Sequence, residues 1–171
     1  MKLNNRILLC SFFVILLSSC STIAKKEITV PEIQLAKNYY KALYDKKYDE
    51  VKKIASSKSF RFSDPTVQKE VANLPTEKNS LEEFLKYMKE SSENLIEPSI
   101  TFEDSFYSNN NVVLYVNFKG SVPAKMFGKS SGTLKFSSRG ISIIEIKDGL
   151  VVGHIDYMDY SMLNELIKAQ L

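Results

Sequence analysis

Asp148-Gly149 constrains the fold of this chain more than any other short segment, because it separates two long apolar stretches. A two-residue hairpin turn needs positive φ angles, which an Asp-Gly pair adopts readily. The flanking stretches, Leu134–Ile146 and Leu150–Tyr157, are rich in the apolar and β-branched residues of strands. The sequence therefore predicts two antiparallel strands joined at Asp148-Gly149.

Helical and strand patterns occupy different parts of the chain. Before Pro98, apolar residues recur at helical spacing, and after it the apolar period is two, as in strands. Ser80 and Glu83 form a capping box ahead of the clearest helical segment. The expected helices are Ile33–Leu43, Tyr48–Ala55, Leu81–Met88 and a closing Ser161–Leu171, and the further strands are Phe60–Phe62, Ile100–Phe106 and Val112–Lys119. This order predicts an α+β domain, with a curved antiparallel sheet wrapped around N-terminal helices.

The composition limits the classes of function. The chain has 171 residues, a formal net charge of +3, one His and two Cys. This length suits one domain, and the charge is too small to favour nucleic acid as a partner. One His excludes a His-rich metal site, and two Cys exclude a disulfide-dense scaffold, so we expect neither a metal nor a cofactor.

The N-terminal segment has the features of a secretory signal. Lys2 and Arg6 precede an apolar run, Ile7–Leu17, which is too short for a comfortable membrane span. The following Leu17-Ser18-Ser19-Cys20 resembles the bacterial lipobox, in which the Cys is alkylated with diacylglycerol and the signal is cut before it. The resemblance implies a membrane anchor at Cys20, with an uncleaved anchor or an ordinary secretory signal as the alternatives.

This anchor implies a domain organisation and a location. We expect a signal peptide at residues 1–19, a lipid-anchored tether at 20–29 and one domain at 30–171. Ser21 stands where many inner-membrane lipoproteins of Gram-negative bacteria carry Asp. The expected location is therefore the bacterial cell envelope, at the periplasmic face of the outer membrane rather than the inner one if the cell is Gram-negative.

Three strings resemble the nuclear transport factor 2-like superfamily, specifically its SnoaL-like branch, across about residues 30–170. They are Phe62-Ser63-Asp64-Pro65, the segment 132–149, and His154-Ile155-Asp156-Tyr157-Met158-Asp159. The resemblance implies a cone-shaped fold with an apolar pocket and a homodimer formed through the outer sheet face. Candidate pocket-lining residues are Tyr40, Phe62, Tyr115, Ile141 and Ile143.

A regular two-residue turn at Asp148-Gly149 would also set which residues face each other. It predicts that Glu145 faces Val152, Ile143 faces His154 and Ile141 faces Asp156. These six residues would then share one face of the sheet. The other face would hold Ile144, Ile146, Val151, Ile155 and Tyr157.

Asp156 and His154 are the candidate catalytic residues. Asp156 stands where limonene-epoxide-hydrolase-like members of the family carry a catalytic Asp, and an apolar pocket tunes a carboxylate for general acid–base work. His154 could orient it. The Arg and Asp that those hydrolases carry on a central strand are absent from Tyr115–Lys119, so epoxide hydrolysis is not expected. The alternative is a surface or strand-end carboxylate, satisfied by Arg139, a Lys or a backbone N–H, beside a half-exposed His.

Three functions remain open at this point. The first is a lipid-anchored, non-catalytic module that binds a small apolar ligand or a partner. The alternative is a SnoaL-like isomerase, cyclase or hydrolase that acts on a small apolar substrate with Asp156 as general base. A third is a structural accessory that pairs through the outer sheet face. Lys125-Met126-Phe127-Gly128 is a loop with an exposed apolar tip, which is a lid, a partner contact or simply a turn.

Overall fold

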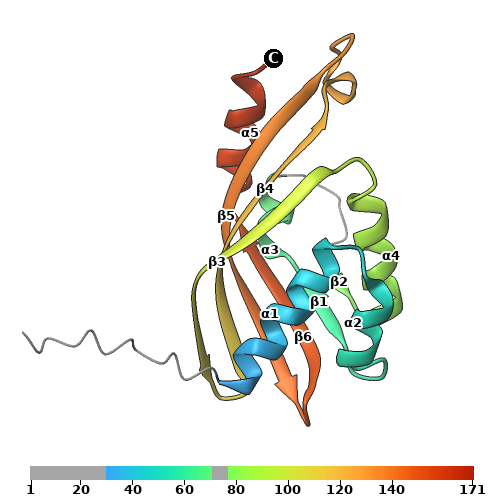
Figure 1. The fold of residues 1–171 in the computed structure, drawn as a ribbon, viewed down its shortest axis with the longest axis vertical. Helices are drawn as coiled ribbons and strands as arrows, with labels where there is room; N and C mark the ends of the chain where they lie inside the picture. The colour runs from blue at the N-terminus through green and yellow to red at the C-terminus, as the bar shows by residue number, and fades with distance from the viewer. Residues whose placement is uncertain (1–29, 71–76) are drawn as a thin grey trace, which may run out of the picture.

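The computed structural model describes residues 30–70 and 77–171, which form one α+β domain, as predicted. Six strands form a single sheet in the order β2-β1-β6-β5-β4-β3, which is antiparallel as predicted except that β1 pairs with β6 in parallel. Figure 1 shows α1, α2 and α4 grouped on one side of the curved sheet. The elements are α1 Pro31–Tyr44, α2 Tyr48–Ile54, β1 Arg61–Ser63, α3 Pro65–Glu70, β2 Glu77–Lys78, α4 Leu81–Ser91, β3 Ile96–Ser108, β4 Asn111–Pro123, the 3₁₀ helix η2 Ala124–Phe127, β5 Thr133–Lys147, β6 Leu150–Met158 and α5 Tyr160–Lys168.

The best-defined helix start is that of α4, where local chemistry decides the boundary. The backbone N–H of Glu83 donates to the Ser80 hydroxyl at 3.2 Å, and that of Asn79 donates to the Glu83 carboxylate at 3.2 Å. These bonds satisfy N–H groups that a helix start leaves without partners. The predicted capping box is therefore confirmed.

The core lies between α1 and the concave face of the sheet. One face of α1 projects onto the sheet. Its large buried side chains are at most 1% exposed, and they are Tyr39, Tyr40 and Leu43. The strand residues that meet them are likewise buried, and they are Val112, Leu114 and Val116 of β4 with Ile144 and Ile146 of β5. Alternate residues of β4 and β5 thus form the floor under α1.

The β5–β6 turn forms as predicted, with positive φ at Asp148 (53°) and Gly149 (74°). The register beyond it differs from the prediction. Ile146 pairs with Val151, but the next pair is Glu145 with Gly153, so Val152 is an extra residue on β6. Such a bulge moves every later side chain of the strand to the opposite face from the one a regular ladder would give.

The bulge corrects the predicted faces of the sheet. His154 pairs with Ile144 and Asp156 with Ser142, so both candidate catalytic residues face the helices. The expected pairs of Glu145 with Val152, Ile143 with His154 and Ile141 with Asp156 are wrong. Val151 lies in the core with Ile144 and Ile146, whereas Ile155 and Tyr157 lie on the outer face.

Within residues 30–70 and 77–171, no helix is both long and apolar enough to cross a bilayer. The predicted signal peptide, Cys20 and the tether lie outside the described residues.

Candidate functional site

A cavity of about 350 Å³ opens between the inner face of the sheet, α4 and α5. Its wall is mostly apolar and aromatic and includes Tyr44, Phe62, Tyr87, Phe136, Leu163 and Ile167. Two carboxylates, Asp64 and Asp156, interrupt this wall. A largely apolar cavity with a few converging polar groups is the usual form of a small-molecule site.

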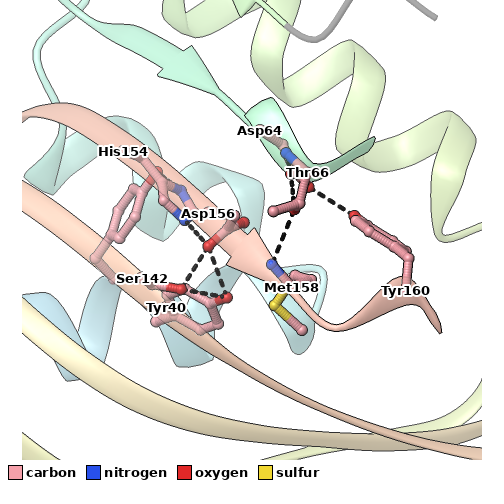
Figure 2. A network of polar contacts seen from close by, with 9 residues as sticks. Tyr40, Asp64, Thr66, Ser142, His154, Asp156, Met158 and Tyr160 are labelled. Carbon is pink, nitrogen blue, oxygen red and sulfur yellow. Dashed lines mark hydrogen bonds and ion pairs between the residues drawn. The ribbon is translucent and has the colours of Figure 1, made fainter. Parts of the chain in front are cut away.

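Asp156 is held at one oxygen and free at the other. Its Oδ1 accepts hydrogen bonds from Nε2 of His154 at 2.9 Å, from the Tyr40 hydroxyl at 3.2 Å and from the Ser142 hydroxyl. Within the described part of the chain, Oδ2 has no hydrogen-bond partner, and it points away from the three donors (Figure 2). The side chain is 12% exposed and lines the cavity, so Oδ2 is available to a molecule bound there.

His154 supports Asp156 from the core. It is 2% exposed and lies among aromatic rings, with Phe62 and Phe84 packed edge-on at 5.3 and 5.6 Å between centroids. Because a carboxylate only accepts, Nε2 of His154 carries a proton in the contact with Asp156. Nδ1 lies 3.1 Å from the Tyr39 hydroxyl, which fixes the orientation of the ring.

The hydrogen bonds keep Asp156 ionised. Burial raises the pKa of its carboxyl group, but the attraction and hydrogen bond of His154 and the hydroxyls of Ser142 and Tyr40 outweigh burial and hold the pKa below its ordinary value. The cavity therefore contains a carboxylate anion at neutral pH.

The neighbouring phenols stay protonated. Burial, and then the negative charge of Asp156, raise the pKa of Tyr39, Tyr40 and Tyr44 above the ordinary value. Burial also raises the pKa of Tyr87, followed by the charges of Asp64 and Asp156. Tyr44 and Tyr87 line the cavity, so each can donate a hydrogen bond to a bound molecule.

Asp64 is the second carboxylate, and it joins several elements. Its Oδ1 accepts from the backbone N–H groups of Thr66 and Val67 at 3.0 and 3.1 Å and from the Thr66 hydroxyl at 2.5 Å. Its Oδ2 accepts from the Tyr160 hydroxyl at 2.6 Å, and the Thr66 hydroxyl accepts from the backbone of Met158 (Figure 2). Both oxygens are thus occupied, and Asp64 connects α3 and the end of β6 to α5.

The sequence interpretation did not single out Asp64 or Tyr160 as site residues. The Asp-Pro-Thr string at the start of α3 is a recognisable local signal, since Asp before Pro suits a helix N-terminus. Tyr160 has no such signal, because its contact with Asp64 spans 96 residues.

The structure places the predicted pocket residues in different environments. Phe62 lines the cavity, and Tyr40 lies in the core behind Asp156. Tyr115, Ile141 and Ile143 do not line it, because they lie on the outer face: Tyr115 pairs with Ile141 and is 39% exposed. Regular alternation through the hairpin predicts that Ile141 and Ile143 share the face of Asp156 and His154, and the bulge at Val152 places them on the opposite face.

The predicted surface environment of Asp156 and His154 is also corrected. Arg139 lies 3.3 Å from Glu103 rather than beside Asp156, and His154 is buried rather than half-exposed. A catalytic role for Asp156 and His154 stays a prediction. Among residues 30–70 and 77–171, no three His, Cys, Asp or Glu side chains gather as metal ligands.

Comparisons with known proteins agree on one fold. Residues 42–165 match the profile of the SnoaL-like polyketide cyclase family. A crystal structure from Shewanella denitrificans OS-217, described as a SnoaL-like polyketide cyclase, superposes with a TM-score of 0.70 at 23% identity, over 81% of this chain and 98% of that one. One from Shewanella putrefaciens CN-32 with the same description has a TM-score of 0.70 at 19% identity, over 84% and 99%.

An epoxide hydrolase of the LEH-like type from M. tuberculosis superposes less closely, with a TM-score of 0.61 at 10% identity, over 81% of this chain and 90% of that one. At these identities the structural matches show the fold alone. No curated protein matches the sequence.

The inward-facing side chains of β4 are apolar. Leu114 and Val116 face the core, and Phe118 faces the cavity.

Proposed function

Because the chain belongs to the SnoaL-like polyketide cyclase family, we propose that it binds a small apolar molecule in its cavity and that Asp156 acts on it as a general base. The observation that carries this proposal is the asymmetry of the Asp156 carboxylate. Three donors hold Oδ1, and Oδ2, on the cavity side, has no hydrogen-bond partner among residues 30–70 and 77–171. A purely structural carboxylate would be expected to use both oxygens, as Asp64 does.

The substrate class follows from what this carboxylate can do. An anionic base in an apolar cavity suits removal of a proton from a carbon next to a carbonyl group. Oδ2 takes the proton, the electron pair of the broken C–H bond moves into the carbonyl, and an enolate results. The phenol of Tyr44 or Tyr87 donates a hydrogen bond to the enolate oxygen. The enolate carbon then forms a bond to a second carbonyl carbon of the same molecule, whose C=O π electrons move to its oxygen, and that oxygen takes the proton from Asp156. In an isomerisation, the enolate instead recovers the proton from Asp156 at another carbon.

Hydrogen exchange on a small apolar ketone tests the base without knowledge of the natural substrate. 2-Tetralone has acidic protons beside its carbonyl group, and their replacement by deuterium is followed by NMR in heavy water. We expect the protein to accelerate this exchange and Asp156→Asn to lower the acceleration by about 100-fold or more. Asp104→Asn, at an exposed carboxylate on β3, is the matched control and should leave the rate unchanged.

A non-catalytic binding module is the competing function, and the cavity by itself favours it. In that case 2-tetralone would bind, as shown by shifts in its NMR resonances, but the exchange rate would equal that of the ketone alone. Equal rates for the unmodified chain and Asp156→Asn would therefore refute the role of Asp156 as a base while leaving a binding role.

We further propose that Cys20 carries the lipid that holds the protein in the bacterial cell envelope. The lipobox-like Leu17-Ser18-Ser19-Cys20 string supports this proposal. Replacement of Cys20 by Ala should release the protein from the membrane fraction. Retention of the Cys20→Ala variant in that fraction would refute lipid anchoring.

The outer face of the sheet supports a homodimer, which we propose as the assembly of the domain. Phe106, Tyr115 and Tyr157 are 48%, 39% and 43% exposed, and the neighbouring Ile141 and Ile143 are half-buried on the same face. Apolar patches of this kind commonly mark protein interfaces. Sedimentation equilibrium should show a dimer that Tyr115→Lys weakens, and a monomer at every concentration would exclude it.

A further inference from the structure

The end of the molecule that carries η2 combines exposed apolar side chains with positive charge. We call this end the basic tip and define it as η2, the connection 128–132 and the adjoining ends of β4 and β5. Met126 and Phe127 on η2 are 53% and 41% exposed. Gly128 continues the turn with a φ of 84°, and no heavy atom other than its chain neighbours lies within 4 Å of where its Cβ would be. The two side chains therefore project from a tight turn rather than lying in a packed layer.

The charge of the basic tip has one sign. Segment 119–137 carries four lysines, Lys119, Lys125, Lys129 and Lys135, and no acidic residue. Lys129 donates to the backbone carbonyl of Gln170, whereas Lys119, Lys125 and Lys135 are exposed. Elsewhere the charges are mixed, as on α2, where Lys52 lies 3.2 Å from Asp49. Glu165 and Lys168 on the adjacent α5 offset each other.

The basic tip is continuous with the cavity. Phe127 belongs to the cavity wall, together with Leu163 and Ile167 of α5. Gln170 fixes the end of α5 against β5, since its amide donates to the Lys135 carbonyl at 2.6 Å and its Oε1 accepts from the Lys135 N–H at 2.9 Å. Figure 1 shows the β4–β5 connection and the C-terminus at one end of the molecule, opposite the β5–β6 turn.

We propose that the basic tip docks on the surface of a lipid bilayer that contains anionic headgroups. Lysines around a pair of bulky apolar side chains match such a surface, because the cations attract the headgroups while Met126 and Phe127 enter the interface. If the basic tip bound a protein partner instead of lipid, the emission of tryptophan at the tip would not change on vesicles. Docking brings the cavity wall at Phe127 to the bilayer, and in combination with the proposed function it makes the ligand an apolar molecule taken from lipid.

The basic tip and the proposed anchor at Cys20 are two separate membrane contacts. Docking by the basic tip does not depend on that anchor or on Asp156. Failure of the test below would therefore leave the general-base proposal intact, and failure of the tetralone exchange would leave docking intact.

A single tryptophan tests the contact by location, because the natural chain has no Trp. The full chain carrying Phe127→Trp is mixed with vesicles of phosphatidylcholine, with or without phosphatidylglycerol. Met126→Trp is a second probe at the basic tip, and Leu150→Trp, 37% exposed beside the β5–β6 turn, is the matched control at the opposite end. Circular dichroism confirms that each variant is folded.

We expect the emission of both tip probes to shift to the blue with phosphatidylglycerol vesicles and to be quenched by brominated lipid, with no change at Leu150→Trp. Adding Lys125→Gln and Lys135→Gln should weaken the apparent vesicle affinity of the tip about 30-fold. Lys53→Gln with Lys86→Gln, two exposed lysines of α2 and α4, should not.

Three results would overturn the proposal. They are unchanged emission at the tip, equal shifts at the tip and at Leu150→Trp, or a shift that does not depend on phosphatidylglycerol. A shift that grows with protein concentration in the absence of vesicles would assign the basic tip to a second copy of the chain instead.

Discussion

Tyr40→Phe tests how the polar network around Asp156 contributes to folding. Tyr40 is fully buried, and its ring stacks on Tyr44 at 5.2 Å between centroids. Phenylalanine keeps this packing and removes only the hydroxyl that donates to Asp156 at 3.2 Å. A hydrogen bond to a charged group contributes about 1.5–3 kcal/mol to stability. Since Ser142 remains as a donor, we expect a loss near the lower value, about 1.5 kcal/mol.

Urea unfolding measures this loss in the free energy of unfolding. For a domain of this size the urea dependence is about 1–3 kcal/mol per molar, so the midpoint should fall by roughly 0.5–1.5 M. Tyr107→Phe is the matched control, because the Tyr107 hydroxyl makes an exposed contact of 3.5 Å with Asn110. Its removal should change stability by less than about 0.5 kcal/mol.

The pH dependence of the loss identifies its origin. The pKa of Asp156 is lower in the folded chain than its ordinary value, so the ionised carboxylate stabilises the fold above the unfolded pKa of about 3.9. This contribution disappears as the pH falls through the folded pKa. The penalty of Tyr40→Phe should therefore be constant near neutrality and shrink below about pH 4. A loss under about 0.5 kcal/mol at neutral pH, or one that grows toward acid, would refute a charge-assisted bond.

Three further variants test how local contacts determine the fold. Ser80→Ala removes the cap of α4 and should cost about 0.5–2 kcal/mol in urea unfolding; no change would show that the cap is dispensable. Gly140→Ala would place a Cβ 2.8 Å from the backbone oxygen of Tyr157, and we expect a loss of about 1–3 kcal/mol, whereas an unchanged melting temperature would contradict this close approach. Tyr160→Phe removes the bond to Asp64 and should speed amide exchange in α5 about tenfold or more, and unchanged exchange there would rule out Asp64 as its attachment.

The sequence predicts the elements well where the signal is local. The turn at Asp148-Gly149, the Ser80 cap and the long strands depend on dihedral preferences and on residues a few positions apart. The sequence does not predict the short α3 and β2, because a segment of two to six residues is too short to show an apolar period.

The faces of the β5–β6 hairpin could not be predicted for a specific reason. Val151 and Val152 are both apolar and both buried, at 0% and 9% exposure, and Gly153 has no side chain. Alternation therefore carries no information across these residues, and nothing in the sequence marks the extra residue. The extra residue decides that Ser142 rather than Ile141 lies opposite Asp156.

The extra residue at Val152 makes the length of β6 a property under functional constraint. A deletion of the one extra residue would leave a regular hairpin in which His154 still lies opposite Ile144 and Asp156 opposite Ser142, so both would still face the helices. A deletion of two residues would leave every polar group of the site chemically intact but, in a regular hairpin, would turn His154 and Asp156 toward the outer face. Wherever the buried carboxylate is retained in this family, we therefore expect either the bulged hairpin of this chain or a regular hairpin that is one residue shorter.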